Sequence, residues 1–171
     1  RNKSEKLLHN IMPKSIAEKL KNNIKTISMD NPEISVLFAD IVSFTEMSEK
    51  TSSEKIVGFL NDMFSQFDDL TETYGVEKIK TIGDSYMVVS GMPVQKEDHA
   101  LTLFNLAKEM IKISAQFKDH NGNPIKLRIG INSGPAISGV IGKSKFAFDV
   151  WGDTINTAAR LESYGSPDCI H

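Results

Sequence analysis

The order of apolar and polar positions along the chain predicts strands and helices in alternation. Residues 34–41 (ISVLFADI) are almost continuously apolar, as in a strand that is covered on both faces. Beyond them, apolar side chains recur every three or four residues, which predicts a long amphipathic helix. They are Ile56, Phe59, Leu60, Met63, Phe64, Phe67 and Leu70. Two β-rich runs, 76–82 and 85–91, are separated only by a Gly-Asp pair, which predicts a hairpin.

The second half of the chain continues this alternation. A helix is predicted over 97–117, and its buried face would carry Ala100, Leu103, Phe104, Ala107, Met110 and Ile111. Two strands at 125–132 and 136–141 follow, with a Ser-Gly-Pro turn between them. A short β-rich run at 146–151 and a helix over 153–163 complete the pattern.

The segment ahead of the first strand differs from the rest in charge. Residues 4–21 have helical spacing of apolar positions, interrupted by Pro13. Residues 1–25 carry seven Lys/Arg and two Glu, a charge of +5; since the whole chain carries −2, the remainder carries −7. An acidic body argues against nucleic-acid binding, and a solvated helix face explains the basic segment better than RNA or membrane contact. We therefore interpret 1–25 as a connector helix and 33–171 as one folded domain.

The composition is that of an ordinary globular domain, with 40% hydrophobic and 25% charged residues among 171. No apolar run approaches the roughly 20 residues that span a bilayer. The single cysteine, Cys169, has no partner for an internal disulfide, which favours a reducing compartment. We expect a cytoplasmic location, including the cytoplasmic side of a membrane-anchored parent protein.

The predicted elements follow the order βαββαβ of ferredoxin-like folds. We therefore predict an α+β domain with that core, an extra hairpin and a C-terminal helix. In this topology the third strand lies between the first and the second and runs antiparallel to both. Asp40 ends the first strand and Asp84 precedes the third, so the two carboxylates are predicted to meet at one edge of the sheet.

Two carboxylates in such a place suit hard divalent cations, because Mg²⁺ and Mn²⁺ prefer oxygen ligands. Two such ions about 4 Å apart can activate an attacking hydroxyl and neutralise a leaving phosphate. The alternative is structural: Asp40 ends a strand and Asp84 fills a turn, and both are common tasks for Asp. Polymerase palm domains use the same arrangement, so this pair does not by itself name a reaction.

Four longer motifs follow one another along the chain. They are FADIVSFT at 38–45, KIKTIGDSYM at 78–87, RIGINSG at 128–134 and DVWGDTINTAARL at 149–161. Each resembles the corresponding motif of class III nucleotidyl cyclase catalytic domains, and LLHNIMP at 7–13 resembles the helix that precedes many of them. Four motifs in the right order are far more specific than any single signature.

The resemblance implies a binding role for the matching residues around the first strand. Asp40 and Asp84 would hold two Mg²⁺ or Mn²⁺ ions, assisted by the backbone carbonyl of Ile41. The turn that ends with Phe44 and Thr45 would present backbone N–H groups to the triphosphate, as turns and helix N-termini can.

The resemblance implies further roles for three residues in the last two motifs. Arg128 would contact phosphate with its guanidinium fork. Asn156 and Arg160 are four residues apart, so on a helix they share one face. In the family this pair orients the ribose and stabilises charge that develops on the α-phosphate, usually the largest catalytic contribution. Spacing alone favours a simpler interpretation, a helix N-terminal turn followed by an exposed arginine.

Lys80 and Asp149 match the two positions that read the purine edge in this family. An ammonium can donate to an adenine ring nitrogen and a carboxylate can accept from the 6-amino group, so the pair fits ATP. Guanine goes with Glu and Cys, and unpaired buried polar groups would penalise the wrong base. Because the sequence around residues 83–91 is more similar to the guanylyl branch, GTP is the alternative substrate.

The resemblance also implies how the chain assembles. Class III cyclases form their active site at a dimer interface, and this chain carries both sets of residues, which predicts a head-to-tail homodimer with two sites. Family members usually continue beyond the position of His171 through strands that carry a phosphate-gripping lysine, so we expect the C-terminal part of the domain to be missing. A non-catalytic dimerisation or regulatory module is therefore the alternative of another class. We expect an upstream regulatory domain in a longer parent protein.

Overall fold

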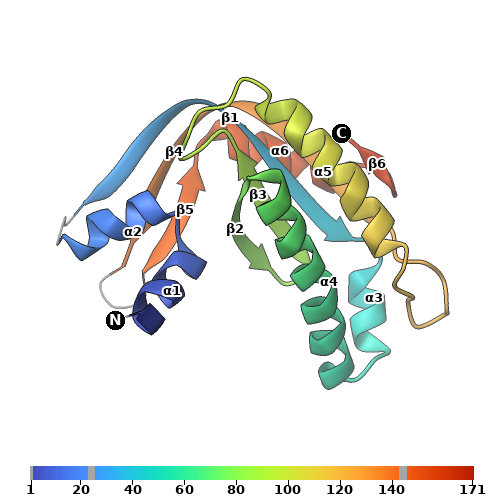
Figure 1. Ribbon diagram of the computed structural model, residues 1–171. Coiled ribbons are helices and arrows are strands. Elements are labelled where there is room, and N and C mark those ends of the chain that lie inside the picture. The colour runs from blue at the N-terminus through green and yellow to red at the C-terminus, as the bar shows by residue number, and fades with distance from the viewer. Residues whose placement is uncertain (1, 23–25, 143–145) are drawn as a thin grey trace.

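The computed structural model describes residues 2–22, 26–142 and 146–171. Helices and strands alternate as an α+β domain with the predicted βαββαβ core (Figure 1). The elements in chain order are α1 Asn2–Ile11, α2 Lys14–Lys21, β1 Ile27–Ile41, α3 Phe44–Glu49, α4 Ser53–Tyr74, β2 Glu77–Ile82, β3 Ser85–Ser90, α5 His99–Ser114, β4 Leu127–Ile141, β5 Ala147–Trp151, α6 Asp153–Ser163 and β6 Cys169–Ile170. The ferredoxin-like core, the hairpin of β4 with β5 and the helix α6 confirm the predicted fold class.

One sheet organises the molecule, with the strand order β2-β3-β1-β4-β5 and with the short β6 paired in parallel to β4. β3 lies between β1 and β2 and is antiparallel to both, as the sequence pattern predicts. β1 and β4 pair over almost their whole length and arch across the molecule (Figure 1). Because β1 is the central strand, its last residues lie beside both β3 and β4.

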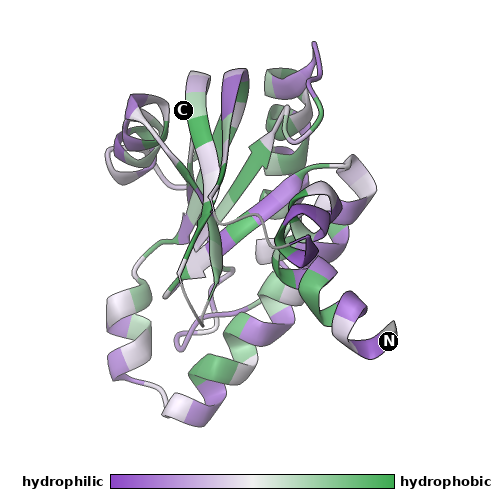
Figure 2. Ribbon diagram, turned by 90° about the vertical axis from the view of Figure 1, so that its left-hand side faces the viewer, coloured by the Kyte–Doolittle hydropathy of each residue, from purple (hydrophilic) through white to green (hydrophobic). Residues whose placement is uncertain are grey.

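Helices cover both faces of this sheet. Alternate side chains of β1 point to opposite faces, so Leu37 and Ala39 pack in one core with α4 and α5, whereas Val36 and Phe38 pack in a second core with α2 and α6. This double burial explains why residues 34–41 are apolar without alternation. The helices carry both apolar and polar positions along their length (Figure 2). Among the described residues no helix is long and apolar enough to cross a membrane.

The predicted Ser-Gly-Pro turn between two strands is wrong, because β4 continues through it as one strand. Opposite it, β1 begins at Ile27 rather than near residue 34. Asn31 pairs with Ala136 and Ile34 pairs with Gly134, so two residues of β1 face one residue of β4 in a β-bulge. The bulge contains Pro32 and faces Pro135, and neither proline has an N–H group to donate to the ladder.

Two helical segments compare differently with the prediction. The segment 4–21 is interrupted at Pro13, as predicted, and forms two helices, α1 and α2; Met12 and Ile16 are buried against the sheet. The helix predicted over 97–117 is the shorter α5, and Phe104, predicted on its buried face, is 44% exposed. Ala100 is likewise exposed. Both lie on the solvent side because α5 uses only its Leu103, Leu106, Ala107 and Met110 side to cover the sheet.

Gly130 allows α6 to lie directly on β4. A Cβ atom at this position would lie 2.6 Å from the carbonyl oxygen of Ala158 and would also overlap the backbone nitrogen of Glu162. We expect Gly130→Ala to lower the free energy of unfolding by about 1–3 kcal/mol or more, as overpacking does. Urea unfolding checks this value. Gly58→Ala is the control: its Cβ would have open space within α4, so this change should stabilise by roughly 0.5–1 kcal/mol.

Candidate active site at the end of the central strands

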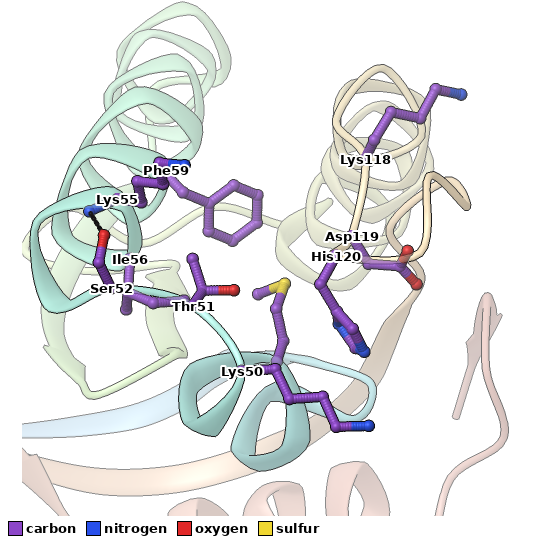
Figure 3. Close-up of a pocket in the computed structure, with 10 residues that line it drawn as sticks. Lys50, Thr51, Ser52, Lys55, Ile56, Phe59, Lys118, Asp119 and His120 are labelled. Carbon is purple, nitrogen blue, oxygen red and sulfur yellow. Dashed lines mark hydrogen bonds between the residues drawn. The ribbon is translucent and has the colours of Figure 1, made fainter.

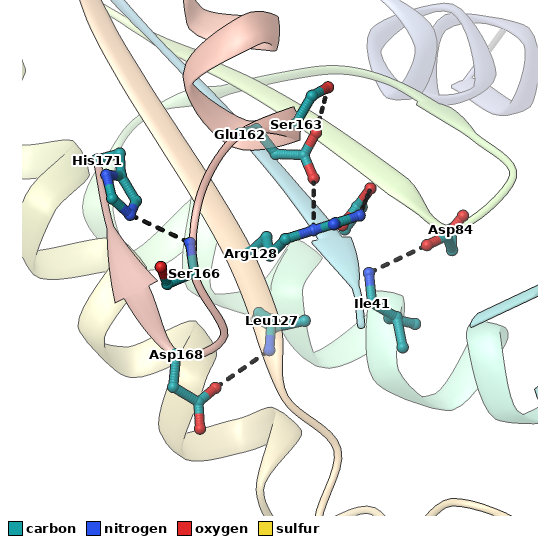
Figure 4. A network of polar contacts seen from close by, with 10 residues as sticks. Ile41, Asp84, Leu127, Arg128, Glu162, Ser163, Ser166, Asp168 and His171 are labelled. Carbon is teal, nitrogen blue, oxygen red and sulfur yellow. Dashed lines mark hydrogen bonds and ion pairs between the residues drawn. The ribbon is translucent and has the colours of Figure 1, made fainter. Parts of the chain in front are cut away.

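The end of β1 brings together the two carboxylates that the topology predicts to meet. β1 pairs with β3 up to Ala39 opposite Tyr86, so the turn that precedes β3 lies beside the last residues of β1. The backbone N–H of Ile41 donates a hydrogen bond of 3.0 Å to Oδ2 of Asp84 (Figure 4). Burial raises the pKa of Asp84, the Ile41 N–H opposes this, and the nearby charge of Asp40 raises the pKa further.

Arg128 joins this site from β4, because the β1–β4 register sets it directly opposite Asp40. Its Nε and Nη2 atoms each lie 3.4 Å from one oxygen of the Asp40 carboxylate. These contacts are long for hydrogen bonds, so the interaction is chiefly an ion pair. This interaction with the Asp40 carboxylate raises the pKa of Arg128. The arginine of the third motif, which is expected to contact phosphate, thus lies beside a carboxylate of the first motif.

Glu162 is a further residue of this site that the sequence does not single out. Its Oε1 atom lies 3.7 Å from Nε of Arg128 (Figure 4). Only 6% of Glu162 is exposed, and within the described parts of the chain Oε1 has no hydrogen-bond partner. Burial raises the pKa of Glu162 to about 8, and Asp40 adds to this. The sequence signal that could have indicated its burial is its spacing, because Glu162 follows Thr154 and Ala158 at intervals of four residues on the buried face of α6.

Lys80 and Asp149 form a second group. Nζ of Lys80 donates to Oδ2 of Asp149 at 2.6 Å, and the backbone N–H of Val150 donates to the other Asp149 oxygen at 2.8 Å. Lys80 lies on β2 and Asp149 on β5, which are the two ends of the strand order, yet the two strands are in contact. The curvature of the sheet therefore joins the two motif positions that the resemblance assigns to base reading.

The remaining candidate residues lie apart from these groups. Asn156 and Arg160 share the exposed face of α6, as their spacing predicts. In the described structure neither side chain has a hydrogen bond or ion pair to Asp40 or Asp84. Phe44 and Thr45 begin α3 directly after Ser43, which has a left-handed φ of 61°. The first N–H groups of a helix have no acceptor within the helix, so this turn can offer N–H groups to a ligand.

A separate cavity of about 450 Å³ lies between α3, the start of α4 and the segment after α5 (Figure 3). Its lining residues are Met47, Lys50, Thr51, Ser52, Lys55, Ile56, Phe59, Lys118, Asp119 and His120. None of them is a candidate site residue. Asp119 is engaged by the N–H groups of Asn121 and Asn123, which help to lower its pKa. This basic hollow is therefore distinct from the carboxylate site.

Comparison with known proteins decides the family. The family described as "Adenylate and Guanylate cyclase catalytic domain" matches residues 26–171. The chain belongs to this family. It is 49% identical over 165 residues to an adenylate cyclase of Mycobacterium tuberculosis, an alignment that covers 96% of this chain and 37% of that protein. It is 41% identical over 171 residues to the guanylate cyclase soluble subunit beta-2 of Rattus norvegicus, which covers 99% of this chain and 25% of that protein.

The solved structures agree with this assignment. The catalytic core of a rhodopsin-guanylyl cyclase with converted specificity, in complex with ATPαS, matches with a TM-score of 0.79 and 38% identity. That match covers 84% of this chain and 78% of the other. The chain spans little more than a third of the length of the mycobacterial cyclase and a quarter of that of the rat subunit. Both nucleotide specificities occur among these relatives, so family membership alone does not name the base.

Cyclases of this family use divalent metal ions, and the carboxylate site of this cyclase domain suits them. Asp40 and Asp84 are like charges close enough for one to raise the pKa of the other, a repulsion that a cation relieves. In the described ranges no group of three or more His, Cys, Asp or Glu side chains could hold an ion by itself. Two carboxylates completed by substrate phosphate oxygens and water are the usual donor set of Mg²⁺. The residues present therefore fit metal ions whose remaining ligands come from the nucleotide and from water.

Proposed function

We propose that this cyclase domain converts ATP to 3′,5′-cyclic AMP and pyrophosphate. The observation that carries the proposal is the approach of Asp40 to Asp84, with Arg128 beside them, at the end of β1. In the reaction the ribose 3′-oxygen forms a bond to the α-phosphorus and the bond to the bridging oxygen breaks. Pyrophosphate leaves with the electron pair, and the 3′-hydroxyl proton passes to solvent.

Each candidate residue has one task in this proposal. Asp40, Asp84 and the Ile41 carbonyl would hold two Mg²⁺ or Mn²⁺ ions, which lower the pKa of the attacking hydroxyl and neutralise phosphate charge. The N–H groups around Phe44 and Thr45 bind the triphosphate. Three further side chains complete the set: Arg128 grips phosphate, Asn156 orients the ribose and Arg160 stabilises charge on the α-phosphate.

The choice of ATP rests on Lys80 and Asp149. Their ion pair holds one ammonium and one carboxylate side by side, half-buried, and leaves N–H donors on Lys80 for an adenine ring nitrogen. The 49% identity to a protein named adenylate cyclase supports the same choice. GTP is the second candidate, because the rat relative at 41% identity is named a guanylate cyclase.

We further propose that the active form is a head-to-tail homodimer. In one chain Asn156 and Arg160 are exposed on α6, while Asp40 and Asp84 lie with Arg128 at the end of β1. A site that needs both groups is then completed by a second copy, and two-fold symmetry gives two such sites. Residues 1–25 serve as a connector from an upstream regulatory domain in a cytoplasmic part of a longer parent, and the catalytic domain begins with β1 at Ile27 rather than at residue 33.

Mixing two inactive variants tests both the activity and the shared site. Asp40→Asn and Arg160→Ala should each lose about 10²–10³-fold in rate alone. Mixed in equal amounts and re-associated, they should recover about a quarter of the wild-type rate, because half of the dimers are mixed and each has one complete site. Cyclic AMP and cyclic GMP are measured with Mn²⁺ and each triphosphate. A mixture no more active than its components would contradict the shared site.

A further inference from the structure

Helix α6 has two faces with different neighbours. Thr154, Ala158 and Glu162 form the buried face, at intervals of four residues. Asn156 and Arg160 also lie four residues apart, on the exposed face of the helix. Under the proposed function the exposed face serves the site of the partner subunit, whereas the buried face touches only residues of its own subunit.

The buried face holds α6 tightly to β4. No side chain separates the two elements at Gly130, where a Cβ atom would lie 2.6 Å from the carbonyl oxygen of Ala158. At the other end of the helix, Oγ1 of Thr154 donates to the carbonyl oxygen of Pro135 at 2.7 Å, and Nδ2 of Asn132 donates to the carbonyl oxygen of Thr154 at 3.2 Å. With backbone contact at one end and hydrogen bonds at the other, α6 and β4 behave as one body.

Glu162 connects α6 to the candidate site residues Arg128 and Asp40 of its own subunit. Its carboxylate lies 3.7 Å from Nε of Arg128, and the same Nε lies 3.4 Å from Asp40. Arg128 therefore stands between two carboxyl groups, that of Asp40 on β1 and that of Glu162 on α6; Figure 4 shows the contact with Glu162. Oε1 of Glu162 has no hydrogen-bond partner among the described residues. Arg128 is the cation that faces it, at 3.7 Å, and the Asp40 carboxyl is a second neighbour, which raises the pKa of Glu162. If Arg128 moves toward a bound phosphate, its contact with Glu162 at the C-terminal end of α6 changes.

We propose that Glu162 is a positioning residue that couples the two active sites of the dimer; this inference rests on the proposed function. Through its contact with Arg128, Glu162 fixes the position of the C-terminal end of α6 relative to Asp40 of its own subunit. The same helix presents Asn156 and Arg160 to the site of the partner subunit. Glu162 thus acts on two sites in two ways: on phosphate binding at its own site, and on the catalytic step at the other.

Mixed dimers with one complete site separate these two effects. An Arg160→Ala protomer supplies Asp40, Asp84 and Arg128 to that site, and an Asp40→Asn protomer supplies Asn156 and Arg160. Glu162→Gln is then added to one protomer or to the other, and ATP turnover is followed with Mn²⁺. In the Asp40→Asn protomer it should lower kcat about 10- to 100-fold with KM unchanged, because a misplaced α6 disorients Arg160. In the Arg160→Ala protomer it should chiefly raise the KM for ATP.

This split between kcat and KM is what a purely structural role would not produce. Loss of folding lowers the amount of mixed dimer equally from either protomer, so equal losses of rate from both overturn the proposal. A change in kcat below twofold from the Asp40→Asn protomer overturns it as well. Glu72→Gln, an exposed change on α4, is the matched control and should alter neither constant.

A second variant and a reference assay ensure that every outcome either supports or contradicts the proposal. If Glu162→Gln does not fold, Glu162→Asp takes its place: it keeps the carboxyl group but withdraws it from Arg128, and the same kcat–KM split is expected. The pair with Glu162 intact is assayed first. No product from that pair contradicts the proposed function itself and removes the basis of the coupling, whereas product from that pair with no split contradicts only the role of Glu162.

Discussion

Asp40→Asn should abolish nearly all cyclase activity while the protein remains folded. The amide has almost the size of the carboxylate but lacks the charge that holds a divalent ion. If that ion supplies about 4 kcal/mol of transition-state stabilisation, its loss costs about 10³-fold in kcat. Stability should change little, because two effects oppose each other. The substitution removes the ion pair of Asp40 with Arg128, but Asp40 also lies beside the carboxyl groups of Asp84 and Glu162 and its charge raises the pKa of both. Removing it relieves that repulsion.

Two measurements check this prediction together: the rate of cyclic AMP formation with Mn²⁺, and the thermal midpoint of unfolding. Asp62→Asn on the exposed side of α4 is the control, since it makes the same chemical change where no candidate residue lies. It should keep the wild-type rate. If Asp40→Asn keeps more than about a tenth of the rate, a tenfold change being worth only 1.36 kcal/mol, the carboxylate does not hold a catalytic metal.

The features of the fold that local pattern controls could be predicted from the sequence. Periods of two and 3.6 residues distinguish strands from helices, and short connections limit the order of the strands. The approach of Asp40 to Asp84 follows from that order alone. The continuity of β4 through Gly134-Pro135 could not be predicted, because the bulge that accommodates it is formed by Pro32 and Glu33, about a hundred residues earlier in the chain.

The candidate site likewise has features that could be predicted from the sequence and features that could not. The motif residues are recognisable because they lie in order along the chain. The ion pair of Lys80 with Asp149 depends on the curvature of the sheet, which brings its two ends together, and no sequence period encodes that curvature. Glu162 was missed because a helical glutamate is usually solvated. Only the contact of α6 with Gly130 and Arg128 shows that this one is buried.

Lys80→Glu combined with Asp149→Cys should reverse the base preference from ATP to GTP. Glutamate can accept from N1 and the 2-amino group of guanine, and loss of the lysine removes the donor to adenine. Sites that hydrogen-bond a substrate group reject analogues by up to about 10⁵-fold when fully buried. Since 40% of the Lys80 side chain and 20% of the Asp149 side chain are exposed, water moderates the effect. We therefore expect the ratio of the two kcat/KM values to change about 10²-fold.

Both substitutions are needed because the two side chains are paired at 2.6 Å. Lys80→Glu alone faces Asp149 with a second carboxylate, and the repulsion should impair both substrates before it changes their ratio. Asp149→Cys relieves that repulsion, so the double variant should turn over GTP faster than either single variant. Lys78→Glu is the matched control: it makes the same charge change on β2, but its Nζ lies 2.9 Å from Asp68 instead. An unchanged ratio in the double variant would mean that another pair of residues reads the base.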